Sequence, residues 1–151
     1  MGAVYFYHMT QTPLEATLPV LLEKSLAAGW RVALRGGSQA GLERLDELLW
    51  LKPEDGFLPH GLAGGPHDGD QPVLMGVDLP VTDRSALICV EGATLDPAEV
   101  GGLARASILF DGRDEIAVQA ARAQWREVTG AGVSAQYWSQ ESGRWEKKAE
   151  A

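Results

Sequence analysis

The sequence predicts an α/β fold: a single three-layer domain with a mostly parallel sheet and helices on both faces. Three observations lead to this fold class. Short branched and aromatic runs typical of strands alternate with segments whose apolar residues recur at helical spacing. Residues 86–91 are almost entirely apolar, as expected of a central strand in a parallel sheet. The chain has 151 residues, 45% of them hydrophobic, which suits one globular domain.

The opening of the chain predicts a strand followed by a helix. Residues 3–8 are aromatic and branched, as is typical of a strand. Thr12 and Glu15 have the spacing of a capping box, with Pro13 at the first helical position. Leucines recur at helical spacing after this signal, and Gly29 is expected to end the helix.

A second strand and helix are expected next, followed by a long loop. The strand is placed at residues 30–34, and Ser38 is the expected N-cap of a helix that carries Trp50 and stops at Pro53. Residues 52–71 then form the loop. Unstructured connections rarely exceed about 15 residues, and longer ones are functional or disordered.

The first part of this loop is unusually apolar. Phe57, Leu58 and Pro59 stand together where polar residues are the rule. Two interpretations remain open. The apolar segment folds back on the core, or it forms with Trp50 an exposed surface for a partner, because large exposed apolar groups mark interaction sites.

The second half of the chain is expected to continue the alternation of strands and helices. Its strands are predicted at residues 72–77, 86–91, 108–110 and 133–138. Asp96 opens a short helix before Pro97, and Asp114 caps a long helix that runs to about Thr129. Residues 1–138 therefore form the predicted domain, and residues 139–151 a polar tail that partly frays.

Composition narrows the classes of function. The chain has no apolar run of the roughly 18 residues that a membrane span needs, and its start lacks the features of a signal peptide, so a cytoplasmic protein is expected. Cys89 is the single cysteine, which excludes an intrachain disulfide. The formal net charge is −8, with only 13 basic residues, so direct nucleic-acid binding is not expected.

Two clusters suggest small ligands, but each has a simpler explanation. Gly36 and Gly37 precede a helix, where amides can bind phosphate, yet the spacing of known phosphate-binding motifs is absent. A tight turn is favoured. His60 and His67 share the long loop with two aspartates, but a glycine-rich tract does not orient metal ligands, so no metal site is expected.

No catalytic site is expected. Asp111, Asp114 and Glu115 follow a strand end, where α/β enzymes place catalytic groups, but helix capping accounts for them. The serine nucleophile motif GxSxG is absent, and no cofactor is indicated. The alternative hypothesis is a small-molecule or nucleotide-binding α/β enzyme that uses residues 52–71 as a lid.

The last helix carries a candidate binding site. Arg122 and Arg126 share a face with Trp125, and Val118 lies one turn before them. Arginines beside an apolar pocket capture acidic peptides and free carboxylates. The alternative is a solvated helix face on which Trp125 covers the core. The residues expected to face the sheet are Ile116, Ala120, Ala123 or Gln124, and Val128.

Several ordered segments resemble the chi subunit family of bacterial DNA polymerase III. They are Arg44-Leu45-Asp46-Glu47, Leu49-Trp50, Phe57-Leu58-Pro59-His60, Leu62-Ala63-Gly64, Gln71-Pro72-Val73, Phe6-Tyr7, Leu109-Phe110-Asp111-Gly112, and Ala121-Arg122 through Trp125-Arg126. Together they span nearly the whole chain. The resemblance implies a Rossmann-like domain that acts as a non-catalytic adaptor, linking the clamp-loader assembly to single-stranded DNA-binding protein.

The resemblance also implies two binding surfaces. The first is the site of the acidic, phenylalanine-ended tail of single-stranded DNA-binding protein, and it maps to Arg122, Trp125 and Arg126. The second receives the psi subunit of the clamp loader and involves the segment that contains Trp50 and Phe57. Without the resemblance, a structural interaction module with a different acidic partner also fits the sequence.

Overall fold

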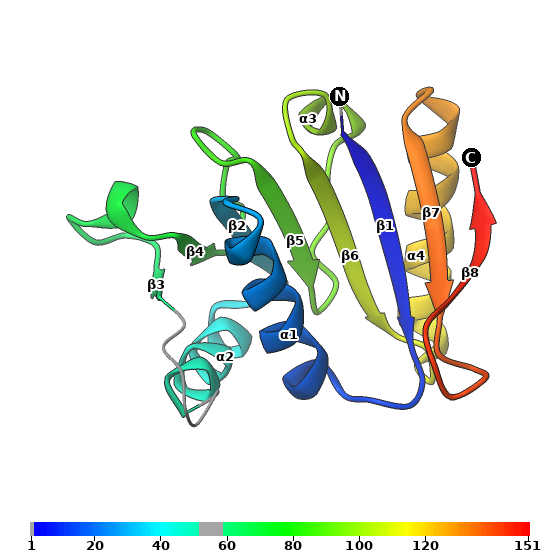
Figure 1. Ribbon diagram of the computed structural model, residues 1–151, viewed down its shortest axis with the longest axis horizontal. Helices are drawn as coiled ribbons and strands as arrows, with labels where there is room; N and C mark the ends of the chain where they lie inside the picture. Colours follow the sequence, from blue (N-terminus) through cyan, green and yellow to red (C-terminus); the bar gives the residue numbers. More distant parts are fainter. Residues whose placement is uncertain (1, 52–58) are drawn as a thin grey trace.

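A computed structural model describes residues 2–51 and 59–151 as an eight-stranded sheet between two layers of helices (Figure 1). The elements in chain order are β1 (Ala3–Met9), α1 (Leu14–Ala27), β2 (Val32–Gly36), α2 (Gln39–Leu51), β3 (His60–Leu62), η1 (Asp68–Asp70), β4 (Val73–Gly76), β5 (Ala86–Val90), α3 (Pro97–Val100), β6 (Arg105–Asp111), α4 (Glu115–Gly130), β7 (Ser134–Ser139) and β8 (Glu146–Glu150). The predicted α/β fold class is confirmed.

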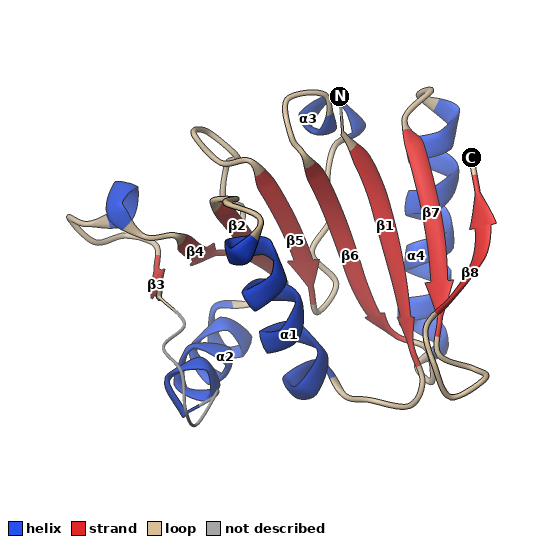
Figure 2. Ribbon diagram, in the orientation of Figure 1, coloured by secondary structure: helices blue, strands red, loops and turns tan. Residues whose placement is uncertain are grey.

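The strand order in the sheet is β3-β4-β2-β5-β6-β1-β7-β8. All neighbouring strands are parallel except β7 and β8, which pair in antiparallel fashion at one edge (Figure 2). The first strand of the chain is therefore central, with β6 on one side and β7 on the other. This placement puts Phe6 beside Tyr137 and brings β1 under α4.

Two hydrophobic cores lie on opposite faces of the sheet. Helices α1 and α2 supply one core, and α4 with the segment around α3 supplies the other. Within β6 the side chains alternate between them, since Ile108 and Phe110 face α4 while Leu109 faces α1. A parallel sheet covered on both faces has strands that are apolar throughout, which explains the uninterrupted runs in β5 and β6.

Several predicted helix boundaries are confirmed. Gly29 adopts a φ of +82° just after α1, a conformation that glycine reaches without strain. The Ser38 hydroxyl accepts from the Gly41 N–H at 3.1 Å at the start of α2. Asp96 forms a complete capping box with Glu99 at α3, and the Asp114 carboxylate accepts from the Ile116 N–H at 3.0 Å.

The capping box predicted for α1 does not form. Pro13 is the N-cap, and the Thr12 hydroxyl bonds to the Thr17 hydroxyl at 2.7 Å instead of a backbone N–H. The preceding turn is held from far along the chain. The side-chain oxygen of Gln140 accepts from the backbone N–H groups of residues 10–12, at 3.1 to 3.3 Å.

The segment predicted as a loop, residues 52–71, contains regular structure in its described part. β3 pairs in parallel with β4, and the 3₁₀ turn η1 follows. Three residues are too few for a strand pattern to be read from sequence. Arg84 donates to the carbonyls of Asp68, Gln71 and Pro72, and Arg31 donates to the Gly69 carbonyl, so arginines outside the segment hold it.

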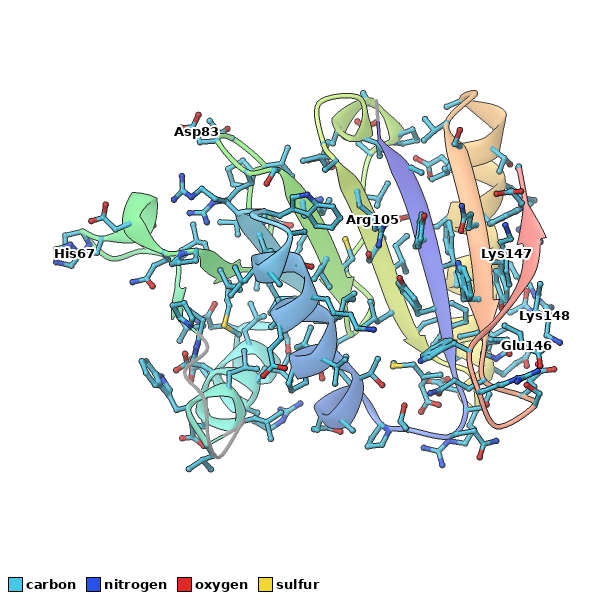
Figure 3. All side chains as sticks on the ribbon, viewed as in Figure 1. His67, Asp83, Arg105, Glu146, Lys147 and Lys148 are labelled. Atoms are coloured by element: carbon cyan, nitrogen blue, oxygen red, sulfur yellow. The ribbon has the colours of Figure 1, made fainter. Side chains whose placement is uncertain are left out.

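The end of the chain, placed by the sequence in a partly frayed tail, forms β8 along β7. Glu146, Lys147 and Lys148 lie on this edge strand (Figure 3). The Trp145 ring meets the Tyr7 ring edge-on, with centroids 5.3 Å apart, and so ties the tail to the front of the sheet. In the part of the chain that the structure describes, no helix is long and apolar enough to cross a membrane.

Candidate partner-binding sites

Helix α4 packs on the sheet with a different face from the one predicted. Its buried residues are Val118, Ala121, Gln124 and Val128. The expectation was correct for Gln124 and Val128, but Ile116 is 82% exposed, and Ala120 and Ala123 are exposed as well. In an alanine-rich helix, several helical faces carry similar apolar patterns. Contacts with β1, β6 and β7 decide which face is buried.

The two arginines of the predicted tail site are exposed on one flank of α4. Arg122 and Arg126 are four residues apart, so they lie one turn from each other. Neither guanidinium forms an ion pair with any described residue. Two cations without internal partners are available to an external anion.

Trp125 lies between this arginine flank and the core. Its ring is half-buried and meets the rings of Phe6 and Tyr137 edge-on, at centroid distances of 5.4 and 6.0 Å. Burial raises the pKa of the Tyr137 phenol, and the positive charge of Arg122 opposes that shift. The tyrosine hydroxyl also lies 3.1 Å from Nδ1 of His8. The arginine flank therefore adjoins an aromatic cluster rather than an acidic one.

Val118, the fourth residue predicted for this site, is only 6% exposed. Its side chain belongs to the hydrophobic core beneath α4. A partner would meet almost none of its surface, so its role is to support the helix from below.

The second predicted surface is partly described. Trp50 is 58% exposed and the adjacent Leu51 is 74% exposed at the end of α2. Pro59 is half-buried, whereas Phe57 and Leu58 lie outside the described residues. Of the two open interpretations of this segment, the exposure of Trp50 favours a partner surface for its helical side.

His60 connects this surface to the edge of the sheet. Its side chain is fully buried, with Nε2 3.1 Å from Asp46 Oδ1 and 3.2 Å from the Asp46 carbonyl oxygen. Its ring centroid is 4.6 Å from that of Trp50. The histidine therefore joins β3 to α2 and supports the tryptophan. The sequence contained no sign of this, because Asp46 is 14 residues away on a different element.

The glycine turn and the histidine loop match their simpler explanations. At Gly37 a side chain would overlap the Glu91 carbonyl oxygen, so this glycine serves close packing between two turns. His67 lies at the outer tip of its segment, far from the sheet (Figure 3). Among the described residues, no group of three or more His, Cys, Asp or Glu side chains could hold a metal ion.

A buried ion pair escaped the sequence analysis. Arg35, at the end of β2, donates to both carboxylate oxygens of Glu99 at 3.0 and 2.9 Å, and also to the carbonyls of Leu79 and Thr94. The side chains are 11% and 24% exposed. The pair ties β2 to α3, 64 residues apart in the chain. A lone arginine at a strand end carries no local signal of such a partner.

The fold and these surfaces define a Rossmann-like α/β protein with an exposed arginine flank on α4 and an exposed apolar surface at the end of α2. Comparison with protein families returned a match to the model of the DNA polymerase III chi subunit, HolC, over residues 1–136. The chain belongs to this family of DNA polymerase III subunits. The matched region includes both surfaces. The comparison with curated proteins returned no match.

Proposed function

We propose that this protein is a non-catalytic adaptor of the replicative polymerase, linking the clamp-loader assembly to single-stranded DNA-binding protein. The observation that carries the proposal is the α4 flank, where Arg122 and Arg126 lie exposed beside the half-buried Trp125. The chi family resemblance assigns the acidic tail of single-stranded DNA-binding protein to these positions. The chemistry agrees, since guanidinium groups bind carboxylates through charge-assisted hydrogen bonds.

The experiment that tests this function is fluorescence anisotropy with a labelled acidic peptide that ends in phenylalanine. Saturable binding is the expected result. Amidation of the terminal carboxylate is expected to weaken binding, because it removes one of the groups that the arginines recognise, whereas shortening of the far end is expected to matter little. A peptide that binds equally well with its terminus amidated would refute the proposed mode of recognition.

A second surface would serve the clamp-loader side of the adaptor. Trp50 and Leu51 present exposed apolar side chains at the end of α2, and the buried His60 supports the Trp50 ring. The proposed partner here is a psi-like clamp-loader subunit. This surface lies on the opposite side of the sheet from α4, so both partners can be bound at once.

Replacement of Trp50 with serine is expected to abolish binding of a psi-like subunit while leaving the fold intact. Trp50 is 58% exposed, so the loss of stability is limited to its ring contact with His60, about 1 kcal/mol. Co-elution on size exclusion measures binding, and thermal unfolding measures stability. Val20→Ser is the matched control, since Val20 is a comparably exposed apolar residue, at 51%, on α1. A large fall in melting temperature for Trp50→Ser would instead assign the tryptophan to the core.

The isolated protein is expected to have negligible affinity for single-stranded DNA at physiological salt. The net charge of −8 repels phosphates, and binding to bare strands needs a basic track that neutralises several of them. Anisotropy with a labelled oligonucleotide is the measurement. Submicromolar binding at physiological salt would contradict this expectation.

The alternative enzyme hypothesis has little support from the geometry. It requires residues 52–71 to close over a ligand site. The largest cavity formed by the described residues lies at the carboxyl ends of β5, β6 and β1, and no residue from 59–71 lines it. The described part of the supposed lid lies at the far edge of the sheet, beside β4 (Figure 1).

A further inference from the structure

A groove of about 560 Å³ opens between the first turns of α1 and α4. It lies outside the carboxyl ends of β1, β5 and β6, the position at which parallel α/β sheets bind ligands. Its volume is in the range of sites that enclose a small ligand or a few side chains. None of Arg122, Trp125 and Arg126 lines it, so it is separate from the proposed tail site.

The walls of this groove are mostly apolar. Leu14 of α1 faces Ile116, Ala117 and Ala120 of α4 across it. Ile116 is 82% exposed, the most exposed large hydrophobic side chain in the described part of the chain. An isoleucine left in water beside a concave apolar surface is typical of a contact site rather than of a helix face that only meets solvent.

The rim of the groove is acidic. Glu15, Glu91, Asp111 and Asp114 line it, against a single cation, Arg113. Asp114 is engaged in capping α4, Glu91 pairs with Arg44 at 3.3 Å, and Asp111 pairs with Arg113 at 3.5 Å. Glu15 has no ion-pair partner among the described residues. The groove therefore combines apolar walls with a net negative rim.

We propose that this groove is a docking site for a basic, amphipathic segment of another protein. Apolar side chains of the segment would occupy the space between Leu14 and Ile116, and its lysines or arginines would meet Glu15 and the other rim carboxylates. The two flanks of α4 would then recognise opposite partners, since one presents arginines to an acidic tail and the other borders an acidic groove.

The test uses a labelled amphipathic peptide of about twelve residues, with leucine and lysine at helical spacing. A twin peptide in which glutamate replaces lysine serves as the control. Anisotropy measures affinity, and amide chemical shifts of the ¹⁵N-labelled protein locate the site. The lysine peptide is expected to bind and to shift the amides of residues 116–120, whereas the glutamate peptide is expected not to bind there. Absence of shifts at 116–120 would overturn the proposal.

Matched variants separate docking from general attraction to an acidic protein. Ile116→Lys and Glu15→Lys are each expected to weaken binding of the lysine peptide by about tenfold. Val20→Lys and Glu23→Lys make the same charge changes at exposed positions of α1 outside the groove, and are expected to change affinity by less than about twofold. Equal effects in both sets would mean that charge alone drives binding, and the proposal would fail.

Two further readouts identify other outcomes. If sedimentation velocity shows a dimer that Ile116→Lys dissociates, the groove is a self-association surface and not a docking site for a basic segment. Binding of the acidic tail peptide is expected to be unchanged in Ile116→Lys, because the tail site lies on the opposite flank of α4. Loss of tail binding in this variant would overturn the separation of the two sites.

Discussion

Replacement of both Arg122 and Arg126 with alanine is expected to weaken binding of the acidic tail peptide by about a hundredfold or more. Hydrogen bonds to charged groups contribute about 1.5–3 kcal/mol each, and each 1.4 kcal/mol is a factor of ten in affinity. The single change Arg122→Ala is expected to cost about tenfold. Melting temperature is expected to stay nearly constant, because both side chains are exposed and form no ion pair within the described residues.

The matched control for this prediction removes two arginines elsewhere. Arg44 and Arg144 have side chains that are 69% and 84% exposed and lie away from α4. Their double alanine variant has the same net charge as the test variant and is expected to retain tail binding nearly in full. Unchanged affinity in the Arg122/Arg126 variant would mean that α4 presents only a solvated face.

Salt dependence provides an independent measure of the same site. Exposed charge pairs are screened over about 8 Å at physiological ionic strength, so higher salt is expected to weaken tail binding. This dependence is expected to diminish in the Arg122/Arg126 variant. Trp125→Ala is a poor substitute for these tests, because its ring also packs on Phe6 and Tyr137 and its loss would disturb the core.

Replacement of Arg35 with alanine is expected to cost about 3–5 kcal/mol of folding stability, the usual penalty for breaking a buried ion pair. The change leaves the Glu99 carboxylate largely buried, at 24% exposure, without its cation. It also leaves the carbonyls of Leu79 and Thr94 without their donors. Urea unfolding at neutral pH measures the loss.

The double variant Arg35→Met with Glu99→Leu tests the cause of this loss. A pair of apolar residues of similar volume leaves no isolated charge, so this variant is expected to recover most of the stability lost in Arg35→Ala. If the double variant is as unstable as Arg35→Ala, the ion pair is not the reason for the loss.

The same pair is expected to make stability depend on pH in the acidic range. Hydrogen bonds from Arg35 lower the pKa of Glu99; burial opposes them, and the Asp96 N–H adds to the lowering. Because the folded-state pKa is the lower one, the stabilisation is complete above the ordinary glutamate pKa of about 4.3 and is lost as the pH falls through the lower folded value. Glu99→Gln is expected to flatten this part of the pH profile. A wild-type profile in the glutamine variant would exclude Glu99 as its origin.

Much of the fold could be predicted because its signals are local. Apolar spacing marked α1, α2 and α4, and single residues such as Ser38, Asp114 and Gly29 marked helix ends, since capping and left-handed turns depend on neighbours a few residues away. The capping box at Thr12 failed for the opposite reason. Gln140, about 130 residues away, satisfies the same backbone groups and leaves the threonine hydroxyl to another partner.

The edges of the sheet could not be predicted. β3 has three residues and β8 is almost entirely polar, so neither has an apolar pattern of its own. Each exists because a neighbouring strand, β4 or β7, offers unpaired backbone groups along its length. The ion pair of Arg35 with Glu99 and the contact of His60 with Asp46 are likewise set by elements that meet only in the folded chain.

For the two sites, the sequence by itself determined the residue types: a pair of arginines one turn apart beside a tryptophan, and a tryptophan at the end of α2. It also contained the motifs that place the chain in the chi family. Only the tertiary structure decided which flank of α4 meets the sheet, and with it the burial of Val118 and the exposure of Ile116. The physical reason is that helical spacing makes several faces of an alanine-rich helix equivalent, and only packing against β1, β6 and β7 distinguishes them.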